Sequence, residues 1–364
     1  MIKGHGDDIY RYTTPIKANF SSNVYCGFNL APLKEHLATK LGSIATYPEP
    51  EPYKLEEAIK KLIFSTDIAS KEVHKDVCVT NGATEAIYLI AQYLSGKTSI
   101  ILVPTFSEYQ DSCSIFNHRI LYAYSLEQVE MLLEENREAA VWVCNPNNPT
   151  GEVRDKKRLL SLFLKFKEAT FILDQSYQFF TKLETILPNE VGDFNNLFLL
   201  NSMTKKYSIP GIRLGYVVAQ KELLDKIRAF RMPWTVNSLA IEAGLYLAQR
   251  GLPPAGDLDE LLSNCALLQR GIMDIRMAGE PLFTVVPTNT HYMLVKINRE
   301  INYKEMQIKS QRAADLKEYL AGKYGILIRD CANFVGLEDN CFRVATQTLM
   351  ENNMLLNGLG SIAL

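Results

Sequence analysis

The sequence lacks the features that would indicate a membrane, a secreted scaffold or a nucleic-acid partner. No apolar run approaches the ~20 residues of a membrane span, and no apolar segment with a small-residue cleavage site opens the chain. The seven cysteines are scattered without a C-x-x-C pair, which favours reduced thiols over disulfides or a zinc site. The five histidines are dispersed, and 39 basic residues nearly balance 41 acidic ones. We therefore expect a cytoplasmic protein that binds no metal, membrane or nucleic acid.

The length of 364 residues suits a large domain and a smaller one. We expect an arm with a short helix over 1–45, a large domain over 46–250, and a small C-terminal domain that begins at the bend GLPPAG of 251–256. Within these segments, periodicity predicts helices over 86–94 and 258–277 and one strand over 325–329. Apolar runs of strand length alternate with helical segments, and this alternation predicts an α/β fold.

One polar segment lies between two strand-like apolar runs in the stretch 197–219. It carries Ser202, Thr204, Lys205 and Arg213. Nearby cations and desolvation lower the pKa of a lysine, and such an amine is the covalent partner that an aldehyde cofactor needs. Arg213 offers planar, directed donors to a phosphate. The alternative interpretation is a solvated surface turn.

A glycine-containing turn joins the predicted strand 77–80 to the next helix. Backbone N–H groups at the positive end of a helix make an anion site, for which Ala83 and Thr84 are the candidate donors. The chain has no P-loop and no G-x-G-x-x-G string, so a nucleotide is not the natural anion here. A helix cap without a ligand is the alternative.

Three further groups follow predicted strands directly. Phe106 follows the strand 99–103, Asn148 lies in the string NPNNPTG of 145–151, and Asp174 follows the strand 170–173 with Tyr177 close behind. A carboxylate at the end of an apolar run needs a partner, and a protonated pyridine nitrogen is one. The alternatives are a core aromatic, a double proline turn and a helix cap.

Together these motifs resemble the class I/II aminotransferase family over essentially the whole chain. These are fold-type I enzymes dependent on pyridoxal 5'-phosphate (PLP), and the resemblance implies a mostly parallel sheet between helices plus a smaller α/β domain. It implies that Lys205 is the catalytic lysine that forms the Schiff base. The other implied cofactor contacts are with the phosphate (Ala83, Thr84, Ser202, Thr204, Arg213), the ring face (Phe106), the phenolic oxygen (Asn148, Tyr177) and the pyridine nitrogen (Asp174).

The string Tyr-Pro-x-Pro at Tyr47 resembles the family segment whose tyrosine reaches the PLP phosphate of the neighbouring subunit. The resemblance therefore implies a homodimer. A rigid proline-rich turn with a packed tyrosine is the alternative.

Within the family, the chain is most similar to histidinol-phosphate aminotransferase and threonine-phosphate decarboxylase. This similarity implies that Arg343, in CFRVA, binds the substrate carboxylate, and that Arg329, His5 and Asn23 are candidates for a substrate phosphate and its approach. The sequence departs from these relatives in three places: Val-Tyr-Cys-Gly follows Asn23 without the family's proline, Asp7-Asp8 brings negative charge near the proposed phosphate subsite, and Asn201 replaces the usual arginine.

Both relatives act on a phosphorylated amine, by different reactions. We place transamination first, because it is the commoner outcome of this constellation, and decarboxylation of O-phospho-threonine as the alternative. The bond at Cα that stands perpendicular to the cofactor ring decides between them. The third hypothesis is a binding module that has no catalytic activity, and the presence of both Lys205 and Asp174 disfavours it.

Overall fold

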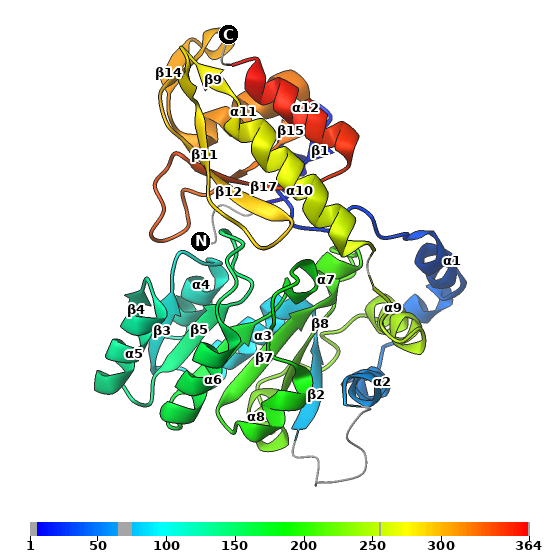
Figure 1. The fold of residues 1–364 in the computed structure, drawn as a ribbon. Helices are drawn as coiled ribbons and strands as arrows, with labels where there is room; N and C mark the ends of the chain where they lie inside the picture. Colours follow the sequence, from blue (N-terminus) through cyan, green and yellow to red (C-terminus); the bar gives the residue numbers. More distant parts are fainter. Residues whose placement is uncertain (1–5, 65–74, 255, 363–364) are drawn as a thin grey trace.

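The computed structural model describes residues 6–64, 75–254 and 256–362, and its largest element is a seven-stranded sheet (Figure 1). The strand order is β2-β8-β7-β6-β5-β3-β4, and only β8 runs antiparallel to its neighbours. The strands are β2 (Lys75–Thr80), β3 (Thr98–Leu102), β4 (Arg119–Ala123), β5 (Ala140–Cys144), β6 (Thr170–Asp174), β7 (Leu197–Ser202) and β8 (Gly215–Gln220). The mostly parallel sheet confirms the predicted fold class.

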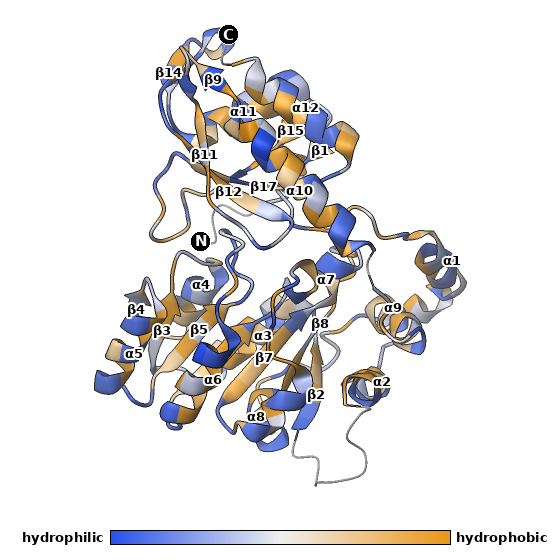
Figure 2. Cartoon of the chain, in the orientation of Figure 1, coloured by the Kyte–Doolittle hydropathy of each residue, from blue (hydrophilic) through white to orange (hydrophobic). Residues whose placement is uncertain are grey.

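Helices cover both faces of this sheet, so its strands are apolar on both sides. Along β5, Val141 and Val143 belong to one hydrophobic cluster, whereas Trp142 and Cys144 belong to the other. The first cluster includes side chains of α1 (Ala31–Thr39), α2 (Tyr53–Ile63), α5 (Leu126–Glu135), α6 (Lys156–Lys165) and α9 (Ser238–Gln249). The second includes α3 (Gly82–Tyr93), α4 (Glu108–Ile115) and α8 (Lys221–Arg228). Figure 2 shows the strands mainly as apolar and the outer helices as mixed.

A second, antiparallel sheet lies toward the C-terminus and has its own hydrophobic core. Its order is β11 (Phe283–Val285), β12 (Tyr292–Ile297), β17 (Cys341–Ala345) and β16 (Arg329–Asp330). Its helices are α10 (Leu258–Met273), α11 (Ala313–Tyr324) and α12 (Leu349–Gly360). Figure 1 places this region against the end of the large sheet where α7 (Met203–Lys206) lies. Among the described residues, no helix has the length and apolar character to cross a bilayer.

The remaining elements are short. The N-terminal β1 (Ala18–Asn19) pairs in parallel with β15 (Ile326–Leu327), so part of the predicted arm belongs with the C-terminal region. Two hairpins pair β9 (Arg276–Met277) with β10 (Glu280–Pro281) and β13 (Ile301–Tyr303) with β14 (Ile308–Ser310). The 3₁₀ helices are η1 (Ile9–Arg11), η2 (Leu41–Ala45), η3 (Gln178–Phe180), η4 (Pro188–Asp193) and η5 (Lys304–Met306). The domain limits stay a prediction.

Three element bounds differ from the sequence prediction. Helix α3 begins at Gly82, four residues before the predicted start, and the Glu85 carboxylate accepts from the backbone N–H of Asn81 at 2.5 Å. Helix α10 ends at Met273, because the chain turns back as the β9-β10 hairpin. The predicted strand 325–329 is two strands, since Gly325 is the left-handed cap of α11 and β15 and β16 pair with different partners.

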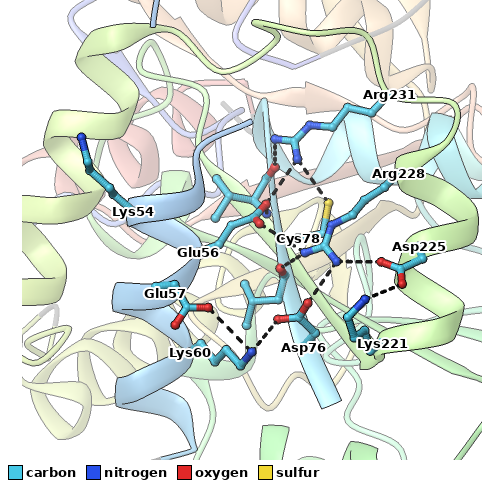
Figure 3. Close-up of polar contacts among 12 residues, drawn as sticks. Lys54, Glu56, Glu57, Lys60, Asp76, Cys78, Lys221, Asp225, Arg228 and Arg231 are labelled. Atoms are coloured by element: carbon cyan, nitrogen blue, oxygen red, sulfur yellow. Dashed lines mark hydrogen bonds and ion pairs between the residues drawn. The ribbon is translucent and has the colours of Figure 1, made fainter. Parts of the chain in front are cut away.

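The edge strand β2 has side chains hydrogen-bonded along its open side (Figure 3). Arg228 Nη2 donates to the carbonyl of Val77 at 2.6 Å, and Arg231 Nη2 donates to that of Val79 at 2.6 Å. The N–H of Val79 donates to Glu56 Oε1 at 2.9 Å, and the Glu56 carboxylate also accepts from both arginines at 3.2 Å. These bonds occupy the groups that would otherwise pair with another strand.

Replacing Glu56 with glutamine should lower the free energy of unfolding by about 3 kcal/mol, because the guanidinium of Arg231, whose side chain is 2% exposed, loses its carboxylate partner. Arg228 keeps Asp76 at 3.0 Å. Chemical denaturation measures this change. Glu57→Gln is the matched control, since Glu57 is exposed and 3.7 Å from Lys60, and it should cost less than about 0.5 kcal/mol. Equal effects of the two substitutions would contradict a structural role for the buried network.

Candidate active site

A cavity of about 430 Å³ lies where the ends of β5, β6 and β7 meet the C-terminal sheet. The structure brings nearly every predicted site residue to its wall: Asn23, Ala83, Thr84, Phe106, Asn148, Asp174, Tyr177, Ser202, Thr204, Lys205, Arg213, Arg329 and Arg343. Tyr47 does not line it and is 83% exposed. His5 lies outside the described residues.

One end of the cavity offers hydrogen-bond donors for an anion. Gly82 has φ +72°, and a Cβ there would lie 2.7 Å from Arg213 Nη2, so glycine lets the guanidinium lie against the start of α3. The hydroxyls of Ser202 and Thr204 are 2.7 Å apart beside it. A helix N-terminus, a guanidinium and two hydroxyls together match a phosphate.

Asp174 is buried at the end of β6 and accepts three hydrogen bonds. Its Oδ1 accepts from the N–H of Ser176 at 2.9 Å and from Ser176 Oγ at 2.6 Å, and its Oδ2 accepts from the Tyr109 hydroxyl at 2.8 Å. Burial raises the pKa of Asp174, and the three hydrogen bonds oppose this rise. The pKa of Asp174 is raised on balance, and a cationic nitrogen beside it would favour the ionised carboxylate.

Tyr109 is a site residue that the sequence analysis missed. Its ring stacks on Trp142 with centroids 5.7 Å apart and meets Phe106 edge-on at 5.8 Å. The signal in the sequence was its spacing, since Tyr109 follows the predicted ring-stacking Phe106 by three residues. Its hydroxyl could be assigned only once β6 was known to lie beside it.

Replacing Tyr109 with phenylalanine should lower kcat about tenfold, because a hydrogen bond to a charged group is lost. The pKa of Asp174 rises further without this donor. Protonation then removes the carboxylate at a higher pH, so the acid limb of the kcat profile should move toward higher pH. Tyr88→Phe is the control, since Tyr88 donates to Glu108 at 2.9 Å outside the cavity. A Tyr109→Phe profile that overlays the Tyr88→Phe profile would contradict this role.

Lys205 lies on α7 and lines the cavity. Burial lowers its pKa to about 8, and the neighbouring cations Arg343 and Arg213 add to the decrease, while Asp7 and Asp174 oppose it. Burial also lowers the pKa of the adjacent Lys206 to about 8, but that side chain does not line the cavity. Lys205 is therefore the lysine that combines a lowered pKa with access to the cavity.

Two buried arginines lie on the opposite wall. Arg329 and Arg343 are paired across β16 and β17, and each is 5% exposed. The Arg343 guanidinium donates to Asn148 Oδ1 and to the carbonyl of Ser21. Within the described part of the chain, the buried Nε of Arg343 has no hydrogen-bond partner, whereas the side chain of the buried Asn23 interacts with the Tyr177 hydroxyl. An unpartnered guanidinium N–H at a cavity wall points to a polar ligand.

Two of the departures from the relatives, Asp7-Asp8 and Asn201, differ in their consequences. Asp8 forms a buried ion pair with Lys317 at 2.6 Å, so its charge is compensated. Asp7 lines the cavity, where its Oδ1 accepts from Asn19 Nδ2 at 2.5 Å. Asn201 is buried in β7, accepts from Gln178 at 2.6 Å and does not line the cavity. Only Asp7 therefore brings an unusual charge to the cavity.

Residues 15–362 match the family model of the class I and II aminotransferases. The chain therefore belongs to this family, and it is an enzyme whose cofactor is PLP. The donor set described above fits that cofactor, with donors for its phosphate, an aromatic ring beside the cavity, a carboxylate for its ring nitrogen and a lysine for its aldehyde.

Individual relatives fall into two groups by reaction. The threonine-phosphate decarboxylase of Salmonella typhimurium is 27% identical over 98% of this chain and 96% of its own. The crystal structure of L-threonine-O-3-phosphate decarboxylase from Porphyromonas gingivalis has a TM-score of 0.84 and 32% identity, covering 94% of this chain and 98% of that one. The histidinol-phosphate aminotransferase of Thermoanaerobacter pseudethanolicus is 25% identical over 89% of this chain and 86% of its own. The chain is similar to both groups along nearly its whole length.

Proposed function

We propose that the chain decarboxylates a small amino acid that carries a second anionic group, of the O-phosphorylated kind. The observation that carries this proposal is the pair of buried arginines, Arg329 and Arg343, on the wall of the cavity that also holds Lys205. Two guanidinium groups suit a substrate with a carboxylate and a phosphate. Histidinol phosphate carries a phosphate but no carboxylate, so in its own half of a transamination it would use only one of them.

The cofactor contacts are proposed from the same geometry. Ala83, Thr84, Ser202, Thr204 and Arg213 would hold the phosphate of PLP. Phe106 would lie against its ring, Asn148 and Tyr177 would bond its phenolic oxygen, and Asp174 would bond its ring nitrogen. All of these residues line one cavity, which supports the assignment.

The reaction then depends on how the chain orients the substrate. When bound, PLP supplies an electron sink for the pair left at the substrate Cα. Arg343 would fix the carboxylate and Arg329 the phosphate, which sets the bond that stands perpendicular to the ring. Lys205 would deliver a proton to Cα after the carboxylate leaves, and its lowered pKa of about 8 suits proton transfer near neutral pH.

Transamination, which the sequence analysis placed first, is the second candidate. The similarity to histidinol-phosphate aminotransferases favours it, and Lys205 could equally remove a proton from Cα. The order is reversed here because two buried arginines line the substrate side of the cavity.

We also propose that the enzyme works as a homodimer in the cytoplasm. Tyr47 does not line the cavity of its own chain, its ring centroid lies 5.2 Å from that of Trp234, and it is 83% exposed. Ile44 and Met232 near these two residues in sequence are exposed as well, and a second copy would bury them. Each of the seven cysteines is a free thiol, which supports a reducing compartment.

The test supplies the PLP-loaded enzyme with O-phospho-threonine, and separately with histidinol phosphate plus 2-oxoglutarate. Carbon dioxide from the first mixture is the expected result. Glutamate from the second mixture, without carbon dioxide from the first, would establish the transaminase instead. Absence of both products would refute the substrate class and direct attention to Asp7.

A further inference from the structure

The residues that follow Lys205 contact the linker between α9 and α10, which joins the region of the large sheet to that of the C-terminal sheet. This linker, whose described residues are 250–254 and 256–257, lies between the end of α9 and the start of α10. Lys206 Nζ donates to the carbonyl of Leu252 at 3.3 Å, and the Tyr207 hydroxyl donates to the carbonyl of Pro253 at 3.1 Å. Two residues that directly follow Lys205 therefore hold two consecutive linker carbonyls.

Lys206 makes its contact with the linker while its ammonium group lies against two aromatic rings. Its side chain is 5% exposed, and its Nζ lies 4.0 Å from the ring centroid of Phe179 and 4.7 Å from that of Tyr207. Within the part of the chain that the structure describes, Lys206 forms no ion pair. Nearby Asp257 caps α10 by accepting from the N–H groups of Asp259 and Glu260 at 2.8 and 3.1 Å. The Leu252 carbonyl and the two rings therefore stabilise the ammonium group.

The N-terminal segment joins the same junction. The N–H of Tyr25 donates to the carbonyl of Lys205 at 3.0 Å, and Ser208 Oγ donates to the carbonyl of Tyr25. The Tyr25 hydroxyl lies against Gly256 of the linker, where a Cβ would be only 2.1 Å away. Three distant stretches of the chain thus meet around the residues next to Lys205.

These contacts connect two parts of the proposed site. Lys205 lies on α7, which directly follows β7 of the large sheet, whereas Arg329 and Arg343 belong to the sheet that α10 packs against. The linker is the covalent connection from α9 to α10. A change at Lys206 is therefore expected to alter how rigidly Arg329 and Arg343 are positioned relative to Lys205.

We propose that Lys206 is a positioning residue, which ties the turn carrying Lys205 to the linker and so holds Arg329 and Arg343 in place before substrate binds. This inference rests on the proposed function, because it takes the two arginines as the substrate's anion sites. If Arg329 and Arg343 are already fixed in the free enzyme, less conformational entropy is lost when substrate binds. Loss of the tie should therefore weaken substrate binding more than it slows the chemical step.

The test substitution is Lys206→Met, which keeps an unbranched side chain and removes the ammonium group. We expect KM for the substrate to rise about tenfold, the equivalent of one lost charged hydrogen bond, with kcat changing less than about twofold. Hydrogen exchange of the apoprotein should be faster at the N–H groups of Gly251 and Leu252, which donate to Ala248 and Leu247 at 2.9 and 3.0 Å. The visible absorption of bound PLP should match that of the wild type.

Two controls accompany this variant. Tyr207→Phe removes only the bond to Pro253 and should change KM and linker exchange in the same direction. Lys226→Met removes an exposed lysine whose Nζ lies 5.9 Å from the Tyr93 ring centroid, outside the cavity, and should change neither.

Unchanged KM and unchanged linker exchange in Lys206→Met would overturn the proposal. A loss of the visible band would overturn it too, because Lys206 would then act on the cofactor itself. Failure of the proposed function would be recognised in the wild-type protein. That protein would show no visible band with added PLP, or would not turn over a doubly anionic substrate. The exchange measurement on the apoprotein still tests the tie in that case.

Discussion

Replacing Lys205 with alanine should abolish the visible absorption of the PLP-loaded protein and lower kcat by at least about 10³-fold. A positioned acid or base contributes about 10²- to 10⁴-fold, and the covalent partner of the cofactor is lost as well. Lys205 is the lysine that lines the cavity with Asp174 and Arg213, so no other described lysine is placed to substitute for it. Absorption spectra and steady-state rates measure the two effects.

Lys206→Met serves as the matched control for this substitution. The two lysines are neighbours in sequence, and burial lowers the pKa of both to about 8. Only Lys205 lines the cavity, so the Lys206 variant should keep the visible band. A Lys205→Ala protein that retains the band and most of its activity would contradict the proposed role.

Replacing Arg343 with methionine should lower kcat/KM about 10²- to 10⁴-fold for every amino acid substrate. Two charge-assisted hydrogen bonds to a carboxylate, at about 1.5–3 kcal/mol each, are lost. The guanidinium also donates to Asn148 and to the carbonyl of Ser21, so the wall around the substrate loses a buried tie. Steady-state kinetics with phosphorylated and unphosphorylated substrates measure the change.

Arg329→Met discriminates between the two proposed anion sites. It should raise KM strongly for a phosphorylated substrate and little for its unphosphorylated analogue, since Arg329 is assigned to the phosphate. A thermal unfolding scan of both variants separates lost binding from lost folding. Equal losses for the two kinds of substrate in Arg329→Met would contradict the division of roles.

The cofactor side of the site could be predicted from the sequence because its functional residues lie in short, recognisable sequence motifs. The NPNNPTG string, with Asn148, and Asp174 each follow an apolar run directly, and Lys205 and Arg213 lie in the polar segment between two such runs. The carboxyl ends of parallel strands meet at one edge, so local pattern is enough to place such groups together. The structure brings them to one cavity wall.

The rest depends on contacts between distant parts of the chain. The hydrogen bond from Tyr109 to Asp174 requires α4 to lie beside β6. The local sequence around Tyr109 does not indicate that these two elements are neighbours. From the sequence, Asp8 is expected to add an uncompensated negative charge. The structure shows that Lys317 of α11 pairs with it at 2.6 Å. Likewise, Gly325 falls inside an apolar run, and only its left-handed conformation divides the predicted strand.

The most direct test of the account is borohydride reduction of the PLP-loaded protein, followed by peptide mapping of the modified lysine. The account predicts that the cofactor becomes fixed to Lys205 alone, because Lys205 faces the cavity while Lys206 is directed toward Phe179 and the carbonyl of Leu252. Attachment at Lys206 or at any other lysine, or a protein that gains no visible band with added PLP, would contradict it.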